Sequence, residues 1–137
     1  SYSVMAVKND GTIYTPAQGL MGKDLLAAGV KDTYNFGPIL IQNGEAQLPW
    51  AETEKYYPRT AVGMVKPNDY VLLVTDTGTY NGLNHWDMVN IFKSYGCTYA
   101  YNLDGGGSAT LYFNGKVMNK LIGNTQRPCA DFLYFTR

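Results

Sequence analysis

The sequence predicts an α+β domain with a mixed, mostly antiparallel sheet and about two helices. Short apolar runs bounded by turn residues recur along the chain and indicate roughly seven to nine strands. Only two segments have the pattern of a helix, and each is closed by a glycine. The length of 137 residues suits a single domain, 1–137, and a hydrophobic content of 45% is enough for a packed core.

The N-terminal half is predicted to begin with a hairpin. Polar and apolar residues alternate over 1–7, Asn9-Asp10-Gly11 forms the turn, and 12–14 begins the returning strand. A short helix is expected over 22–29, because Gly29 is a typical helix-closing residue. A structured loop and a strand are expected next, at 34–38 and 39–41, before a tight turn at Asn43-Gly44.

Two strands are predicted in the middle of the chain. The first covers 59–65 and is entered through an arginine, and a turn at 67–69 follows it. The second covers 70–75 and is apolar without interruption. Such a run predicts a central strand that is covered on both faces of the sheet.

A second helix is expected over 85–95. Asn84 is a good N-cap and Asp87 occupies the position of the acidic partner in a capping box, while Gly96 ends the helix. Its apolar face is predicted to carry residues at three-residue spacing, namely Trp86, Val89, Phe92 and Tyr95. The only histidine, His85, is expected to be a solvated residue at the start of this helix.

The C-terminal part adds a strand at 98–103, a hairpin around Asn114-Gly115 and a last strand at 132–135. The strand at 70–75, the helix and the strand at 98–103 together form a strand–helix–strand unit. This unit predicts two parallel strands whose carboxyl ends meet at one edge of a sheet.

Composition excludes several classes of function. The formal net charge is zero and no basic run occurs, which argues against nucleic acid as a partner. No apolar run is long enough to span a membrane, and one histidine cannot build a multi-histidine zinc site. No metal or cofactor is predicted, although Asp76 and Asp104 offer hard oxygen ligands of the kind that Ca²⁺ or Mg²⁺ takes, and two carboxylates are too few to define such a site. Cys97 and Cys129 can be a disulfide or two buried thiols.

A loop with three consecutive glycines carries the clearest functional signal. It reads Asn102-Leu103-Asp104-Gly105-Gly106-Gly107-Ser108-Ala109-Thr110. Three adjacent glycines suggest a close approach of the backbone to a ligand, or several N–H groups directed at one anion. Ser108 and Thr110 add hydroxyl groups at the exit of the loop. The whole combination suits an oxygen-rich ligand such as a sugar or a phosphate.

Charged residues at the strand ends complete the candidate site. Asp76 and Asp104 are expected at the same sheet edge, where two carboxylates can divide acid, base or nucleophile roles. Arg59 and Arg127 are the cations expected to bind a phosphate through paired hydrogen bonds. The structural alternatives are a cap or turn role for each aspartate and a surface ion pair for each arginine. Candidate sugar-stacking residues, with packing as the alternative role, are Trp50, Tyr56, Tyr57 and Tyr80.

The glycine loop resembles the signature of the phosphodiester glycosidase family. Further blocks occur in the family's order: Asn35-Phe36-Gly37-Pro38 with Asn43-Gly44, then Arg59-Thr60-Ala61-Val62-Gly63, and later Arg127-Pro128. The resemblance implies hydrolysis of a sugar-1-phosphodiester, such as an N-acetylglucosamine-1-phosphodiester. It implies catalytic roles for Asp104, Asp76 and Arg59. Phosphate or substrate binding is implied for Asn102, Gly105, Gly106, Gly107, Ser108, Thr110 and Arg127.

Two departures from the family pattern open alternatives. The family usually has Asp-Gly-Arg where this chain has Asp76-Thr77-Gly78, and residues 1–34 lack its upstream Asn-Gly element. The chain is therefore expected to be the C-terminal part of a larger domain. An N-terminal fragment or a second chain is expected to complete it, and a homo-oligomer is a separate expectation. The alternative function is a non-catalytic module of a cell-surface or phage protein that binds glycan or phosphate. An extracellular or cell-surface location is expected for either function.

Overall fold

The computed structural model describes residues 3–48, 55–78 and 81–136. Within them it forms two α-helices and ten strands, arranged as an α+β fold with mostly antiparallel pairing. This confirms the predicted fold class. A five-stranded sheet has the order β5-β4-β8-β6-β7, and a three-stranded sheet has the order β2-β1-β3.

The N-terminal sheet contains the predicted hairpin. β1 (Val4–Lys8) pairs antiparallel with β2 (Ile13–Tyr14) and with β3 (Val30–Asn35). The predicted helix is α1 (Gly22–Ala27), followed by Gly29 at a φ of +80°. Strand β3 was missed by the sequence analysis, because Lys31, Asp32 and Thr33 leave it without an apolar pattern.

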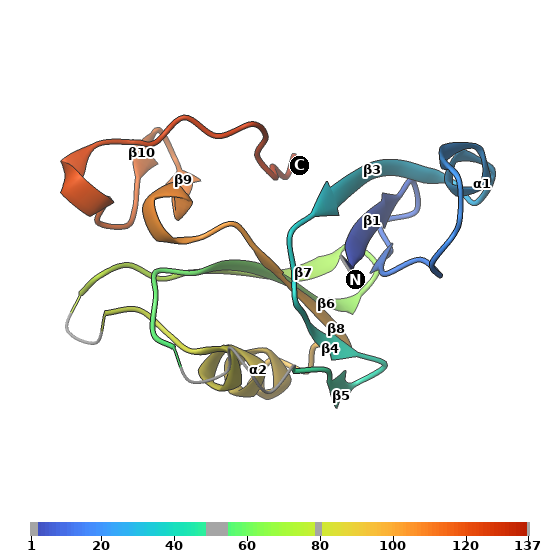
Figure 1. Ribbon diagram of the computed structural model, residues 1–137, viewed down its shortest axis with the longest axis horizontal. Coiled ribbons are helices and arrows are strands. Elements are labelled where there is room, and N and C mark those ends of the chain that lie inside the picture. The colour runs from blue at the N-terminus through green and yellow to red at the C-terminus, as the bar shows by residue number, and fades with distance from the viewer. Residues whose placement is uncertain (1–2, 49–54, 79–80, 137) are drawn as a thin grey trace.

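The larger sheet holds the centre of the molecule. Its members are β4 (Ile39–Gln42), β5 (Glu45–Ala46), β6 (Thr60–Lys66), β7 (Asp69–Val74) and β8 (Tyr99–Leu103). α2 (His85–Ser94) covers one face, and the N-terminal sheet packs against the other (Figure 1). Two cores result, one on each face: Met88, Val89 and Phe92 of α2 pack in the first, and Met5 and Ile13 in the second.

Strand β7 corrects one prediction. It is an edge strand that pairs only with β6 among the described strands, rather than the central strand that its apolar run predicted. Leu72 remains 46% exposed. The run is nevertheless explained by the layers, because Leu73 packs against the α2 core and Tyr70 packs against the N-terminal core.

Helix α2 begins and ends as predicted, but it buries a different face. Asn84 caps it with Asp87 as the capping-box partner, and Gly96 follows its end. The buried residues are His85, Met88, Val89 and Phe92, whereas Trp86 and Tyr95 are exposed. The predicted solvent exposure of His85 is therefore wrong, since its side chain is fully buried.

The C-terminal part is the least packed region. β9 (Tyr112–Phe113) and β10 (Lys116–Val117) form the predicted hairpin as a separate two-stranded sheet. The predicted strand at 132–135 is not formed: these residues have no ladder partner within the described chain. Both cysteines are free thiols, Cys97 buried and Cys129 exposed, so the expectation of two buried thiols holds only for Cys97.

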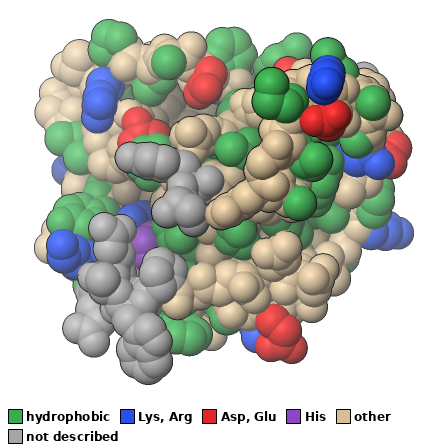
Figure 2. Space-filling model, turned by 45° about the vertical axis from the view of Figure 1, so that its right-hand side comes forward, with side chains coloured by type: hydrophobic (Ala, Val, Ile, Leu, Met, Phe, Trp, Pro, Cys, Tyr) green, Lys and Arg blue, Asp and Glu red, His purple; other side chains and the backbone are tan. Residues whose placement is uncertain are grey.

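The surface carries no concentration of one charge on the face drawn in Figure 2. Acidic and basic side chains are scattered there among hydrophobic ones. No helix in the described part of the chain is both long and apolar enough to cross a bilayer.

Candidate active site

The sheet topology brings the predicted catalytic residues to one edge. β6 runs antiparallel to both β7 and β8, so β7 and β8 are parallel with β6 between them. Thr60, the first residue of β6, lies opposite both Val74 and Leu103. Arg59 comes one residue before Thr60 in the chain. Asp76 comes two residues after Val74, and Asp104 comes one residue after Leu103, so all three residues lie at the same end of these strands. The parallel arrangement expected from the strand–helix–strand unit is therefore present, with one strand inserted.

The glycine loop packs closely on the segment that enters β6. A Cβ atom at Gly105 would lie 2.5 Å from the carbonyl oxygen of Pro58. The next amide, Gly106 N–H, donates to that same carbonyl at 2.8 Å, and Gly106 has a φ of +56°. Two glycines are thus required by the backbone itself, through close approach at Gly105 and left-handed conformation at Gly106.

Asp104 is exposed at the start of this loop. Its Oδ1 accepts the N–H of Gly105 at 2.9 Å, and its other oxygen has no hydrogen-bond donor among the described residues. Since Gly105 and Gly106 already donate to Asp104 and Pro58, their N–H groups do not form an open anion nest in this conformation.

Arg127 lies beside the loop. Its Cδ is 3.5 Å from the position that a Cβ atom of Gly107 would occupy, and the side chain is exposed. Thr110 is partly buried a few residues further on. The exposed carboxylate of Asp104 therefore precedes the three glycines, and the side chain of Arg127 lies beside the last of them.

Arg59 holds the neighbouring backbone together. Its Nε donates to the carbonyl of Leu83 at 3.1 Å, and its Nη2 donates to that of Lys55 at 2.9 Å. The guanidinium also lies 5.2 Å from the centre of the Tyr57 ring. These contacts join the segment before β6 to the segment before α2.

The sugar-stacking candidates are only partly placed. Tyr56 and Tyr57 are both about half exposed, and Tyr57 lies beneath the Arg59 guanidinium. Trp50 and Tyr80 lie outside the described residues.

Asp76 connects the end of β7 to the C-terminal segment. Its Oδ1 accepts the N–H of Gly78 at 2.9 Å, and its Oδ2 accepts the N–H of Lys120 at 2.8 Å. These hydrogen bonds, the one from Lys120 first, lower the pKa of the carboxyl below its ordinary value. Asp76 also lines a cavity of about 370 Å³ with Leu83, Leu111 and Met118.

Three buried oxygen atoms that have no hydrogen-bond partner within the described part of the chain gather near this edge. They are Thr60 Oγ1, Asn102 Oδ1 and Ser108 Oγ. Asn102 is 2% exposed, and its Nδ2 donates to the carbonyl of Gly37 at 2.8 Å. Unpaired buried oxygens are costly in a folded protein and are typical of functional sites. Thr60 was missed as a candidate, because a threonine at the start of a strand has no distinguishing pattern.

The buried histidine also belongs to this end of the molecule. A short turn after α2 returns the chain along β8, so His85 at the start of α2 and Asn102 near the end of β8 lie at the same end of the sheet. Within residues 3–48, 55–78 and 81–136, no group of three or more His, Cys, Asp or Glu side chains is placed to hold a metal ion.

A comparison with family models decides the relationship. The family model described as "Phosphodiester glycosidase" matches residues 1–136 of this chain. The chain belongs to the phosphodiester glycosidase family. The resemblance seen in the glycine loop is thereby confirmed.

Relatives of this chain are longer proteins. It is 30% identical over 132 residues to the uncharacterized SPbeta prophage-derived protein YomE of Bacillus subtilis strain 168, covering 91% of this chain and 20% of YomE. It is 43% identical over 58 residues to mouse N-acetylglucosamine-1-phosphodiester alpha-N-acetylglucosaminidase, covering 42% of this chain and 11% of the mouse protein. The chain thus spans only a fraction of the curated relatives that it matches.

Solved structures share the fold of this chain. The catalytic domain of zebrafish N-acetylglucosamine-1-phosphodiester alpha-N-acetylglucosaminidase, auto-inhibited by its pro-peptide, superposes with a TM-score of 0.71 at 24% identity. The match covers 87% of this chain and 44% of that one. A hypothetical protein from Synechocystis has a TM-score of 0.59 at 18% identity, over 86% of this chain and 30% of that one.

Proposed function

We propose that this chain provides the site of a glycosidase that hydrolyses a sugar-1-phosphodiester, such as an N-acetylglucosamine-1-phosphodiester. The observation that carries the proposal is that, in a family member, the exposed carboxylate of Asp104 directly precedes the glycine loop and the Arg127 side chain lies beside Gly107. A cation suits the phosphate of such a substrate, and a carboxylate suits its anomeric carbon.

The reaction breaks the bond between the anomeric carbon and the phosphate oxygen. Water supplies the new oxygen, and the phosphomonoester leaves with the electron pair of the broken bond. Positive charge develops on the sugar ring in the transition state, where the Asp104 carboxylate stabilises it or removes a proton from the attacking water. Arg127 stabilises the negative charge that collects on the leaving phosphate.

The other candidates are assigned to shaping this site. Arg59 orients the segment against which the glycine loop packs, through its hydrogen bonds to Lys55 and Leu83. Asp76 attaches the C-terminal segment to the same edge. Asn102 and Ser108 offer buried oxygens, and Gly107 places the loop beside Arg127.

The proposal is tested with purified chain and a synthetic N-acetylglucosamine α-1-phosphodiester, with free sugar and phosphomonoester as the measured products. The Asp104→Asn variant keeps the shape of the side chain and removes its charge. We expect kcat/KM to fall on the order of 100-fold or more. Asp69→Asn is the matched control, because Asp69 is also exposed but lies at the opposite end of β7. Equal rates for the wild type and Asp104→Asn would remove Asp104 from the mechanism.

A second candidate function is binding of a glycan or phosphate without turnover. It is favoured by the departure at Asp76-Thr77-Gly78, where the family pattern has an arginine that this chain lacks. Saturable binding of the phosphodiester without product formation would decide for this function.

The site is proposed to be completed by a further segment, either N-terminal to this chain or from a second chain. The superposition on only 44% of the zebrafish catalytic-domain chain supports this proposal. For substrate, we favour a bacterial cell-surface polymer with phosphodiester links, which places the reaction outside the cell. The B. subtilis prophage relative supports a bacterial or phage setting.

A further inference from the structure

A second cavity lies away from the proposed active site. It has a volume of about 300 Å³ and is lined by the first hairpin, β3, the turn between β6 and β7, and residues 133–136. Tyr70, at the start of β7, lines it, whereas Asp76 lies two residues beyond the end of that strand. At about 3.3 Å per residue the two are roughly 20 Å apart, so one small ligand cannot occupy both places.

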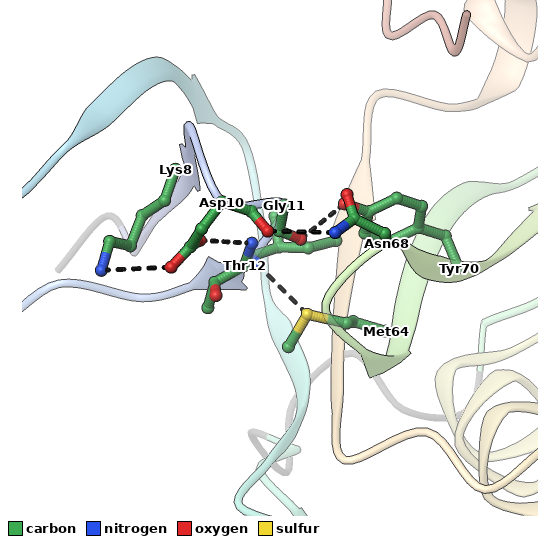
Figure 3. Close-up of polar contacts among 8 residues, drawn as sticks. Lys8, Asp10, Gly11, Thr12, Met64, Asn68 and Tyr70 are labelled. Atoms are coloured by element: carbon green, nitrogen blue, oxygen red, sulfur yellow. Dashed lines mark hydrogen bonds and ion pairs between the residues drawn. The ribbon is translucent and has the colours of Figure 1, made fainter. Parts of the chain in front are cut away.

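The walls of this cavity are held by contacts between distant parts of the chain (Figure 3). The Tyr70 hydroxyl donates to the carbonyl of Gly11, and Asn68 Nδ2 donates to that of Asp10 at 3.1 Å. The N–H of Ile13 donates to the Met64 sulfur at 3.3 Å. Gly11 has a φ of +87°, and a Cβ atom there would collide with the Asn68 side chain. The cavity is therefore preformed by bonds that join the first hairpin to the β6–β7 hairpin.

Aromatic rings supply much of its lining. Tyr34, Tyr70, Tyr134 and Phe135 all face it, and the rings of Tyr70 and Phe135 are 5.1 Å apart in a tilted arrangement. Burial, followed by the nearby charge of Asp32, raises the pKa of Tyr34, so its hydroxyl remains a proton donor at neutral pH. Aromatic rings with polar edges pack on the C–H faces of sugars and hydrogen-bond their hydroxyls.

The remaining polar groups suit a neutral ligand. Lys31 and Asp32 carry opposite charges side by side, and Asn9 and Asn68 add amide groups. Among the described residues, the side chains of Lys31 and Asp32 form no hydrogen bond or ion pair. No arginine of residues 3–48, 55–78 or 81–136 lines the cavity, and the Arg127 side chain lies instead beside the glycine loop. Asp, Asn, Lys and Tyr together present both donors and acceptors, as a polyol requires.

We propose that this cavity binds one neutral pyranose unit of a glycan. The site lies outside the proposed catalytic edge, so it would bind a different unit of a polymer from the one attacked. Binding of a sugar in this cavity does not depend on Asp104 or on hydrolysis of the polymer.

The test is an NMR titration of the isotopically labelled chain with methyl N-acetyl-α-glucosaminide, a neutral sugar without a phosphate. We expect saturable shifts of the backbone amides at 31–34 and 68–70, with a Kd on the order of 1 mM. Inorganic phosphate is the second probe and should leave these amides unchanged. The Asp104→Asn variant should bind the sugar as the wild type does, which separates this site from the proposed active site.

Tyr134→Ala is the decisive variant, because its ring is 70% exposed and its removal leaves both cores intact. We expect roughly tenfold weaker sugar binding. Tyr112→Ala is the matched control: Tyr112 is 67% exposed on β9 and does not line the cavity. The proposal is overturned if the sugar causes no saturable shift, if Tyr134→Ala binds as tightly as Tyr112→Ala, or if phosphate shifts the same amides.

Discussion

Both carboxylate oxygens of Asp76 are occupied by backbone N–H groups, from Gly78 and from Lys120. The sequence pattern placed this aspartate at the correct sheet edge, because it follows an apolar strand. Its second partner could not be predicted, since Lys120 is 44 residues further along the chain. Such a contact depends on how the C-terminal segment returns to the sheet, which no local pattern encodes.

This geometry makes the stability of the chain depend on Asp76 at neutral pH. The hydrogen bonds favour the ionised carboxylate in the folded state and lower its pKa below the unfolded value of about 3.9. The stabilisation is therefore present above about pH 4 and is lost as the pH falls through the lowered pKa. We expect Asp76→Asn to reduce the free energy of unfolding at pH 7 by roughly 1 kcal/mol, after allowance for partial exposure.

Urea denaturation at several pH values measures this effect. The difference between the wild type and Asp76→Asn should shrink as the pH is lowered from 7 toward 3. A difference that stays constant over this range would mean that the charge of Asp76 does not contribute.

At the scale of elements, α2 and β7 show where sequence patterns succeed and fail. Capping signals located α2 correctly, because they act within a few residues of each other. Its face was misjudged because strict three-residue spacing drifts around a helix: at about 100° per residue, Trp86 and Tyr95 lie about 180° apart. The edge position of β7 could not be predicted, because two cores make even an edge strand apolar on both faces.

The contact of α2 with the sheet depends on the absence of a side chain at Gly63. A Cβ atom there would lie 2.5 Å from Phe92 Cδ1 and 2.8 Å from Cys97 Sγ. We expect Gly63→Ala to destabilise the fold by about 1–3 kcal/mol through overpacking, measured by urea denaturation.

Gly22→Ala is the matched control for Gly63→Ala. A Cβ atom at Gly22 would meet nothing within 4 Å, and alanine favours the start of α1. It should be neutral or slightly stabilising. Adding Phe92→Leu to Gly63→Ala should recover part of the lost free energy of unfolding. If it recovers none, the destabilisation does not arise from the contact with Phe92.

At the scale of the whole molecule, α2, the five-stranded sheet and the N-terminal sheet form three layers around two cores (Figure 1). The α+β class followed from the sequence, because alternation, turn residues and caps are local signals. The apolar and aromatic residues at 132–135 also have the pattern of a strand. A strand requires a ladder partner, however, and the pattern does not specify one. The glycine loop was located for the same local reasons, whereas its packing on Pro58 depended on the sheet order.

The central claim is that ligands bind at the sheet edge formed by Asp104, the glycine loop and Arg127. The most direct measurement is an NMR titration with N-acetylglucosamine 1-phosphate, which carries the sugar and the phosphate of the proposed substrate. We expect saturable shifts centred on the amides of Asp104–Ser108 and on the Arg127 side chain. Binding that leaves these groups unchanged, or no binding at all, would contradict it.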